Sequence, residues 1–314
     1  MMPPQTDNRA QAAVFILLAI FFASTQDAIV KGMSSNYPAY ESLIFRGMTS
    51  LPILAFWHLR KNSFSTFLTP YWGRVVVRAL ILCSAYIAFI LSIAAMPIAN
   101  MVAIYFTMPF FVAGLAGPLL GERVPMYRWI AIIFGFIGVL IMVRPGIQAF
   151  EPASLLALYS AFGYAVGQMM GRTQAQLVPP LVIANIQNAV YLLVAVAMGA
   201  VVYFAGFSGE ANKSLAFLTR PFVLPTGDDF KLLLSMGVLA AFTIVCFIKA
   251  YGSAEANFVA PFEYSGMIWA VLYGFLFFSD FPDIWTWCGM AVVAGAGFYM
   301  LTKDRVRIRQ LQMG

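Results

Sequence analysis

Three ionisable side chains, Asp27, Arg46 and Glu263, lie inside long apolar stretches of the sequence. Insertion of a charged group at such a place costs about 2.5–3.5 kcal/mol on membrane-insertion scales. Each of these residues is therefore expected to have a polar partner or a functional role. Asp27 lies about six residues before the end of its stretch, and Arg46 about seven residues into the next one, which puts both about 9–10 Å below the same surface. Their equal depth on consecutive antiparallel helices predicts an Asp27–Arg46 pair.

The Asp27–Arg46 pair has three interpretations. It is a static salt bridge between two helices, an outer gate or contact for a charged substrate group, or no pair at all because Arg46 extends to the interface. Lys31 and Glu41 are predicted to form a second pair one turn nearer the water.

Glu263 lies at a different depth from Arg46 and has small residues at helical spacing, such as Ala270 and Gly274. Small residues on one face favour close helix packing. Glu263 is therefore either a protonated or hydrogen-bonded group in a packed interface, or a group that binds substrate or a proton.

Glycines and aromatic residues add further candidates. Gly163, Gly167 and Gly171 recur every four residues, which predicts a close approach between two helices. Four aromatic residues lie away from the ends of apolar stretches, where packing is their ordinary role: Tyr105, Tyr164, Tyr264 and Trp269.

The composition identifies the elements that must position these side chains. Hydrophobic residues make up 61% of the 314 residues and charged residues 10%, whereas ordinary soluble domains are about 25% charged. Because about 20 apolar residues cross a bilayer as a helix, the sequence predicts an all-α integral membrane protein with ten transmembrane helices. The predicted spans are 11–33, 39–58, 75–96, 99–120, 127–143, 153–171, 180–205, 231–252, 257–279 and 283–302.

The basic residues flank the apolar spans, and their placement predicts that both termini are cytoplasmic. This distribution also argues against nucleic-acid binding, despite the net charge of +6. Cys83, Cys246 and Cys288 have no metal or redox spacing, and the single histidine, His58, lies at the end of an apolar run. We therefore expect no metal site and no cofactor.

The chain also resembles itself. Ala99-Asn100-Met101-Val102-Ala103 aligns with Ala256-Asn257-Phe258-Val259-Ala260, and the match continues along the fourth and ninth predicted spans. The repeat unit contains five spans, which is an odd number. The second copy therefore starts on the opposite side of the membrane and must be inverted. The sequence thus predicts two inverted five-helix repeats, 1–147 and 148–314, with a substrate site between them.

A corresponding alignment of the earlier spans matches Asp27 with Gln168 and Arg46 with Gln187. Because the repeat is inverted, these glutamines are predicted to lie near the inner surface. The hypothesis is a charged pair at an outer gate and a Gln168–Gln187 amide pair at an inner gate.

Several short motifs resemble those of the drug/metabolite transporter superfamily, in its ten-helix EamA-type branch. They are Gln26-Asp27-Ala28-Ile29-Val30-Lys31, Phe45-Arg46-Gly47, Ala103-Ile104-Tyr105-Phe106-Thr107-Met108-Pro109, Leu120-Gly121-Glu122-Arg123 and Ala260-Pro261-Phe262-Glu263-Tyr264. The resemblance implies carriage of amino acids, vitamins such as riboflavin, S-adenosylmethionine or other small metabolites. It also implies a central cavity lined by aromatic residues, for which Tyr105, Tyr164, Tyr264 and Trp269 are the candidates.

Together these observations predict a secondary transporter in the bacterial inner membrane. It would move an amino acid, or a vitamin-like or nucleoside-like compound, by alternating access. A channel or lipid flippase is the alternative, and a membrane-embedded enzyme is least favoured because no nucleophile–base pair or carboxylate cluster is present. The expected partners are the small-molecule substrate and the lipid bilayer, with a homodimer left open.

Overall fold

The computed structural model describes residues 8–60, 63–120, 125–144, 151–175, 177–206, 213–253, 259 and 262–313. Within these ranges the secondary structure is helical, and no strand occurs. Three of the sequence segments named above fall partly outside these ranges, at residues 121–123, 256–258 and 260–261.

A helix or a pair of helices occupies each of the ten predicted apolar ranges. These are α1 (Arg9–Met33), α2 (Ala39–Leu59), α3 (Trp72–Ala95), α4 (Ile98–Tyr105) with α5 (Met108–Leu120), α6 (Met126–Val143), α7 (Ala153–Gln174), α8 (Pro180–Ala205), α10 (Gly227–Ser253), α12 (Ser265–Phe278) and α13 (Ile284–Met313). Two shorter helices are η1 (Phe64–Phe67) and α9 (Lys213–Thr219). Seven helical stretches in the described ranges are long and apolar enough to cross a membrane.

The structure differs from the sequence prediction at three places. The fourth predicted span is broken into α4 and α5, because Pro109 has no backbone N–H and the Thr107 hydroxyl caps the Ile104 carbonyl at 2.7 Å. The connection after α8, which lies between two predicted spans, contains α9. The last helix continues past residue 302 to Met313.

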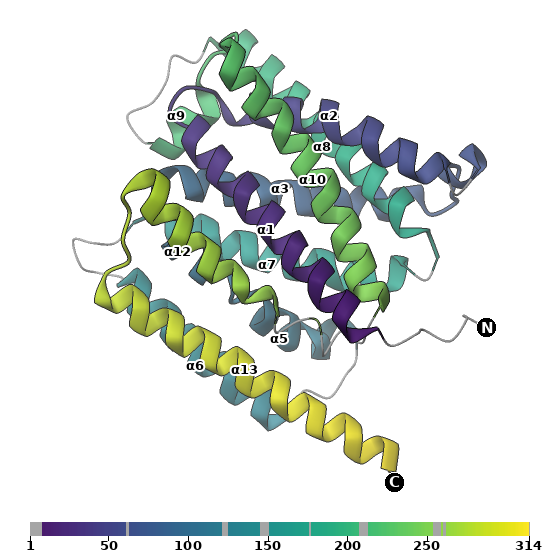
Figure 1. The fold of residues 1–314 in the computed structure, drawn as a ribbon, viewed down its shortest axis with the longest axis vertical. Helices are drawn as coiled ribbons and strands as arrows, with labels where there is room; N and C mark the ends of the chain where they lie inside the picture. The colour runs from purple at the N-terminus through teal and green to yellow at the C-terminus, as the bar shows by residue number, and fades with distance from the viewer. Residues whose placement is uncertain are drawn as a thin grey trace.

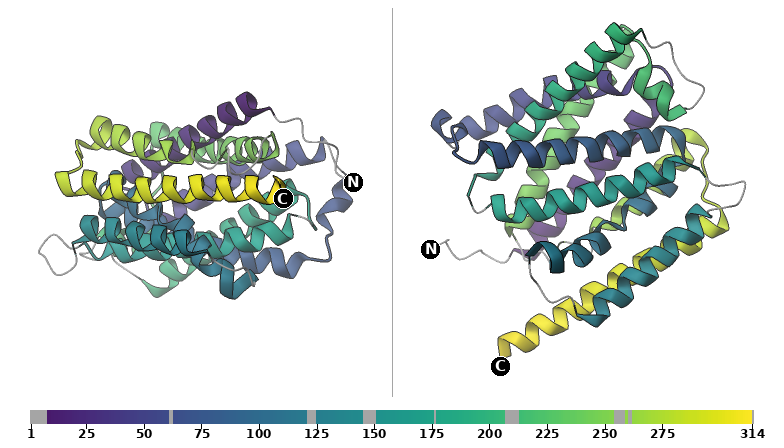
Figure 2. Two further views of the ribbon diagram at one scale, coloured as in Figure 1. Left: turned by 90° about the horizontal axis from the view of Figure 1, so that it is seen from below. Right: turned by 180° about the vertical axis from the view of Figure 1, so that it is seen from behind.

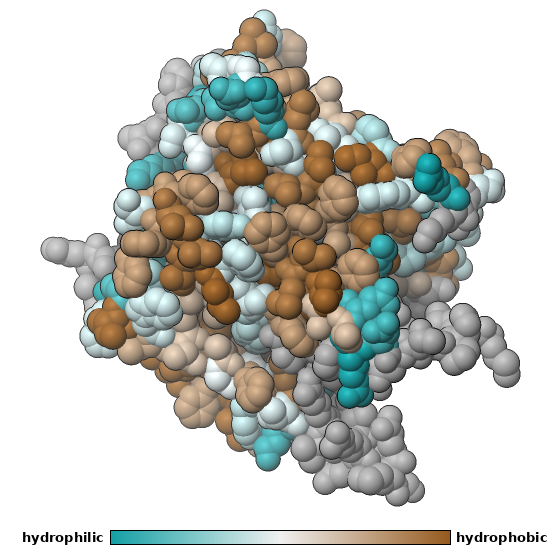
Figure 3. Space-filling model, in the orientation of Figure 1, coloured by the Kyte–Doolittle hydropathy of each residue, from teal (hydrophilic) through white to brown (hydrophobic). Residues whose placement is uncertain are grey.

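The long helices pack as a tilted bundle, with α1 against α10, α3 against α7, and α2 against both α8 and α10 (Figure 1). Helices α6 and α13 lie side by side along one edge (Figure 2). The beginning of α1 and the end of α13 lie toward the same end of the bundle. Apolar side chains cover the middle of the face presented by α1, α10 and α12, and hydrophilic ones gather toward its margins (Figure 3). This surface suits a protein surrounded by lipid.

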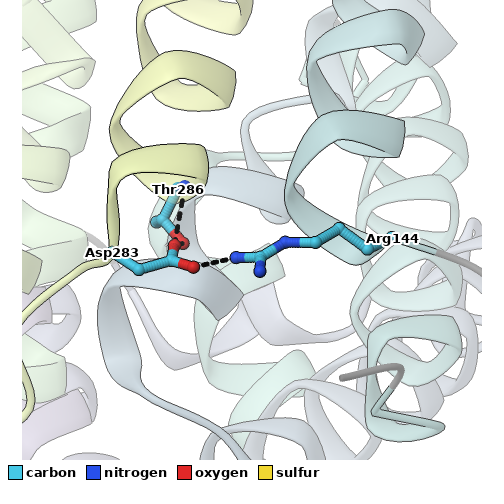
Figure 4. Close-up of polar contacts among 3 residues, drawn as sticks. All are labelled: Arg144, Asp283 and Thr286. Atoms are coloured by element: carbon cyan, nitrogen blue, oxygen red, sulfur yellow. Dashed lines mark hydrogen bonds and ion pairs between the residues drawn. The ribbon is translucent and has the colours of Figure 1, made fainter. Parts of the chain in front are cut away.

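A polar contact joins the end of α6 to the beginning of α13 (Figure 4). Asp283 caps α13, because its Oδ1 accepts hydrogen bonds from the Thr286 backbone N at 2.9 Å and hydroxyl at 2.7 Å. Arg144, in the left-handed conformation after α6, forms an ion pair with the same carboxylate. These contacts fix the ends of two helices that are far apart in the sequence.

The Asp283 contacts predict a pH-dependent contribution to stability. Partial burial opposes ionisation, but the hydrogen bonds from Thr286 and the charge of Arg144 outweigh it, so the pKa of Asp283 lies below its ordinary value of 3.8. A lowered pKa stabilises the fold above the unfolded-state value, and this contribution is lost as pH falls through the native pKa. We expect Asp283→Asn to lower the free energy of unfolding at pH 7 by about 1 kcal/mol or less. This loss is measured in detergent as a slightly lower thermal midpoint.

The same comparison at about pH 3 supplies the control, since the difference between Asp283→Asn and wild type should shrink there. A difference that is independent of pH would contradict the assignment of this effect to the ionised carboxylate.

Candidate functional site

The centre of the candidate site is Arg46, an α2 residue that is only 8% exposed. Its guanidinium lies 5.0 Å from the ring centroid of Tyr86 on α3 and 5.6 Å from that of Tyr191 on α8. It donates to the Gln26 Oε1 at 3.5 Å and to the Asn188 Oδ1 at 3.3 Å. Four helices, α1, α2, α3 and α8, therefore meet at one buried cation.

The two amide groups around Arg46 are oriented by their other hydrogen bonds. Gln26 donates through Nε2 to the Tyr86 hydroxyl at 2.8 Å, which leaves its oxygen for Arg46. Asn188 donates through Nδ2 to the Ala184 carbonyl at 2.8 Å, and its oxygen also accepts from the Ser50 hydroxyl at 3.2 Å. Buried polar groups with complete hydrogen bonding form a rigid site.

Asp27 lies beside this network but does not form the predicted ion pair with Arg46. The Arg46 donors reach the neighbouring Gln26 instead, because successive helical residues point about 100° apart. Within the described part of the chain, the Asp27 carboxylate has no hydrogen bond or ion pair, although it lies within electrostatic range of Arg46. Its side chain is only partly buried.

A second arginine extends the network along α3 and α8. Arg78 donates to the Gly167 carbonyl at 2.8 Å and to the Gln187 Oε1 at 3.2 Å. Gln187 donates onward to the Tyr191 hydroxyl at 3.4 Å. The predicted Gln168–Gln187 pair is absent from these contacts, and Gln168 is exposed on α7. Gln187 is thus joined to the Arg46 network, and Gln168 is not.

The glycine stripe of α7 lies against α3. A Cβ atom on any of these glycines would come within 3.1 Å of an α3 side chain: Gly163 faces Ala85, Gly167 faces Leu82 and Gly171 faces Arg78. Because these three glycines have no side chains, α3 can approach α7 closely. Arg78 is held at the end of this interface.

Three of the four predicted cavity aromatics form one cluster beside the break between α4 and α5. The Tyr105 ring contacts those of Tyr164, at 5.4 Å, and Phe106, at 6.4 Å. Phe106 stacks on Tyr264 with the centroids 4.9 Å apart. The buried hydroxyl of Tyr264 has no hydrogen-bond partner among the described residues.

Trp269 belongs to a separate aromatic group between α1 and α12. Its ring centroid lies 5.0 Å from that of Phe21 and 5.7 Å from that of Tyr273. Glu263 accepts a hydrogen bond from the Tyr251 hydroxyl on α10. This contact agrees with the hydrogen-bonded interpretation of Glu263 and does not involve Arg46.

Lys31 closes one end of the bundle with partners other than the predicted Glu41. Its Nζ lies 3.0 Å from the Asp280 carboxylate and donates to the Met96 carbonyl at 2.7 Å. Glu41 accepts instead from the Val223 backbone N at 3.3 Å. Lys31 thereby connects α1 with the ends of α3 and α12.

Sequence reasoning missed much of the Arg46 network. The missed residues are Gln26, Ser50, Arg78, Tyr86, Asn188 and Tyr191. Polar residues in apolar spans were the available signal, since Gln26 adjoins Asp27 and Asn188 adjoins Gln187. Among the described residues, no group of three or more His, Cys, Asp or Glu side chains could hold a metal ion.

Comparison with known proteins identifies this arrangement of helices. Residues 10–144 match the sequence profile described as the EamA-like transporter family. This part of the chain is therefore similar to the EamA-like transporter family. The chain is 29% identical to a riboflavin transporter of Rhizobium johnstonii, over 85% of its length and 80% of the relative.

Two other similar proteins have different names. An S-adenosylmethionine uptake transporter of Rickettsia prowazekii is 21% identical, over 93% of this chain and 92% of the relative. A pseudopaline exporter of Pseudomonas aeruginosa is 25% identical, over 92% and 95%. A crystal structure of another protein superposes on 95% of this chain and 99% of its own, with a TM-score of 0.64 at 16% identity. That likeness concerns the fold alone.

Proposed function

We propose that this EamA-like protein is a secondary transporter that carries a small organic metabolite across the bacterial inner membrane by alternating access. The observation that carries the proposal is the Arg46 network. It joins Gln26, Arg46 and Tyr86, from the proposed first half, to Asn188 and Tyr191 from the second. A polar site shared between two halves can be exposed to either side as the halves move.

The helix packing supports two related halves, 1–147 and 148–314. Each helix of one half has a counterpart at the same position in the other half. When both helices of a main packed pair are replaced by their counterparts, the result is again a packed pair. Thus α1 with α10 corresponds to α7 with α3, α2 with α10 to α8 with α3, and α1 with α12 to α7 with α5. Two further pairs, α2 with α8 and α6 with α13, correspond to themselves. Such a pattern is typical of an internal two-fold repeat, and the odd number of spans in each half makes it inverted.

The orientation follows from the same proposal. The beginning of α1 and the end of α13 lie toward one end of the bundle, which we assign to the cytoplasm from the distribution of lysine and arginine. The Lys31–Asp280 pair joins α1 to the end of α12 across the two halves. On this assignment the pair closes the outer end, and it must break when the site opens outward.

The chemistry of the site favours a vitamin-like, nucleoside-like or amino-acid substrate. Arg46 and the free carboxylate of Asp27 offer opposite charges, and the rings of Tyr86 and Tyr191 offer flat apolar surfaces. A few polar groups among aromatic side chains are typical of sites for small metabolites. Relatives named for riboflavin and S-adenosylmethionine support this range.

Thermal unfolding of the purified protein tests the substrate range. We expect one class among riboflavin, S-adenosylmethionine, amino acids and nucleosides to raise the midpoint, since a ligand at 100 times its Kd stabilises by about 2.7 kcal/mol. The responding compound should then be taken up by vesicles that contain the protein and not by empty vesicles. A compound that shifts the midpoint without being transported would contradict the proposed function.

A further inference from the structure

Arg78 is a charged residue of a membrane-spanning helix with only neutral partners. It is the seventh residue of α3 and donates to the Gly167 carbonyl at 2.8 Å and to the Gln187 amide oxygen at 3.2 Å. No carboxylate of the described residues forms an ion pair with it. A cation in a membrane span without a counter-charge is costly, which makes it a candidate for function.

The Arg78 and Arg46 guanidinium groups bind neighbouring neutral residues of α8. Arg78 binds Gln187, and Arg46 binds the next residue, Asn188. Tyr191 lies between them, because its hydroxyl accepts from Gln187 and its ring contacts Arg46. Successive Cα atoms are about 3.8 Å apart, so the two arginines belong to one continuous polar region.

The charges of this region do not balance within the described residues. Asp27 lies near Arg46, but Glu263 is bound to Tyr251, and Glu41 to the backbone N–H of Val223. The region thus holds two guanidinium groups and one nearby carboxylate, which lies beside Arg46. An anionic ligand would supply the missing charge.

We propose that Arg78 is the anion-binding residue of the substrate site, and that the substrate carries a carboxylate or phosphate group. This inference rests on the proposed transport function and specifies that the transported compound is negatively charged at one group. The anion replaces the amide oxygen of Gln187 on Arg78. Because Arg78 is only partly buried and Arg46 is almost completely buried, a ligand can reach Arg78 first.

Two pairs of flat compounds that differ mainly in charge provide the test: nicotinate with nicotinamide, and riboflavin 5′-phosphate with riboflavin. Binding of each to the purified full-length protein is measured by calorimetry in neutral detergent. We expect at least one anion to bind the wild type about tenfold or more tightly than its neutral partner. Arg78→Gln should remove that preference, because it weakens binding of the anion far more than binding of the neutral compound. Arg78→Lys should restore part of it, which separates a charge effect from misfolding.

The matched control is Arg74→Gln, because Arg74 lies one turn earlier on α3 and is exposed. It should leave the preference for the anion unchanged. Equal affinities of wild type and Arg78→Gln for the anions would overturn the proposal, as would no anion binding at about 1 mM. Loss of anion binding on addition of phosphatidylglycerol, in wild type but not in Arg78→Gln, would also overturn it by assigning Arg78 to a lipid headgroup. If only neutral compounds are bound and transported, the anion proposal fails while the transport function stands.

Discussion

Arg46→Gln is expected to reduce transport by about 100-fold or more in reconstituted vesicles. The guanidinium makes two hydrogen bonds, to Gln26 and Asn188, and contacts two tyrosine rings. A hydrogen bond to a charged group contributes about 1.5–3 kcal/mol, and each 1.4 kcal/mol is a factor of ten. The variant also leaves the buried amide oxygen of Gln26 without its donor, so we expect a loss of stability of about 1–2 kcal/mol. Initial uptake rates and thermal midpoints measure the two effects.

Asp27 provides an internal check on the Arg46 prediction. Arg46→Gln leaves the Asp27 carboxylate in the membrane without its neighbouring cation, so adding Asp27→Asn should recover part of the lost stability. Simple addition of the two single effects would show that the residues are not coupled. Arg60→Gln is the matched control, because Arg60 follows the same helix and is exposed. A similar loss of transport in Arg60→Gln would contradict a specific role for Arg46.

Gly237→Ala is expected to have the largest effect of any single added methyl group near the site. A Cβ atom on this α10 residue would lie 2.5 Å from the backbone oxygen of Arg46 and 2.9 Å from the backbone N of Ser50. Backbone atoms cannot rotate away, so α10 must separate from the segment of α2 that carries the arginine. Overpacking of this kind costs about 1–3 kcal/mol. We expect a lower thermal midpoint and reduced uptake.

Gly295→Ala is the control for Gly237→Ala. Gly295 also lies within a long apolar helix, α13, but a Cβ atom there would meet nothing within 4 Å. Alanine favours a helix over glycine by about 0.5–1 kcal/mol, so this variant should be neutral or slightly stabilised. If Gly237→Ala unfolds at the same temperature as Gly295→Ala, the contact between α10 and α2 is not as close as described.

The helices could be predicted because a membrane span has a strong sequence signal. About 20 apolar residues in a row mark each one, and a helix or helix pair lies in every predicted range. The break after α4 was missed because Pro109 lies in an otherwise uniform apolar run. Proline is also tolerated in membrane helices, as Pro52 is within α2, so its presence alone does not reveal a break.

The position of Arg46 beside α1 could also be predicted, but its hydrogen-bond partners could not. The depth of a residue in the membrane follows from its position along the helix. The prediction that α1 and α2 meet at the level of Arg46 agrees with the hydrogen bond from Arg46 to Gln26. The direction of a side chain depends on helix rotation, and one residue of difference selects Gln26 in place of Asp27. The contribution of α8 depends on tertiary packing between segments more than 140 residues apart in the sequence. A pattern within single spans carries no information of that kind.

Counterflow measured in vesicles tests the central claim most directly. Vesicles with purified protein are loaded with the unlabelled compound that stabilises it, and uptake of a trace of the labelled compound is followed. A transporter that alternates between two sides should accumulate label transiently above its equilibrium level in wild type and not in Arg46→Gln. Uptake without this accumulation, rising linearly with concentration, would instead indicate a channel and would contradict alternating access at the Arg46 site.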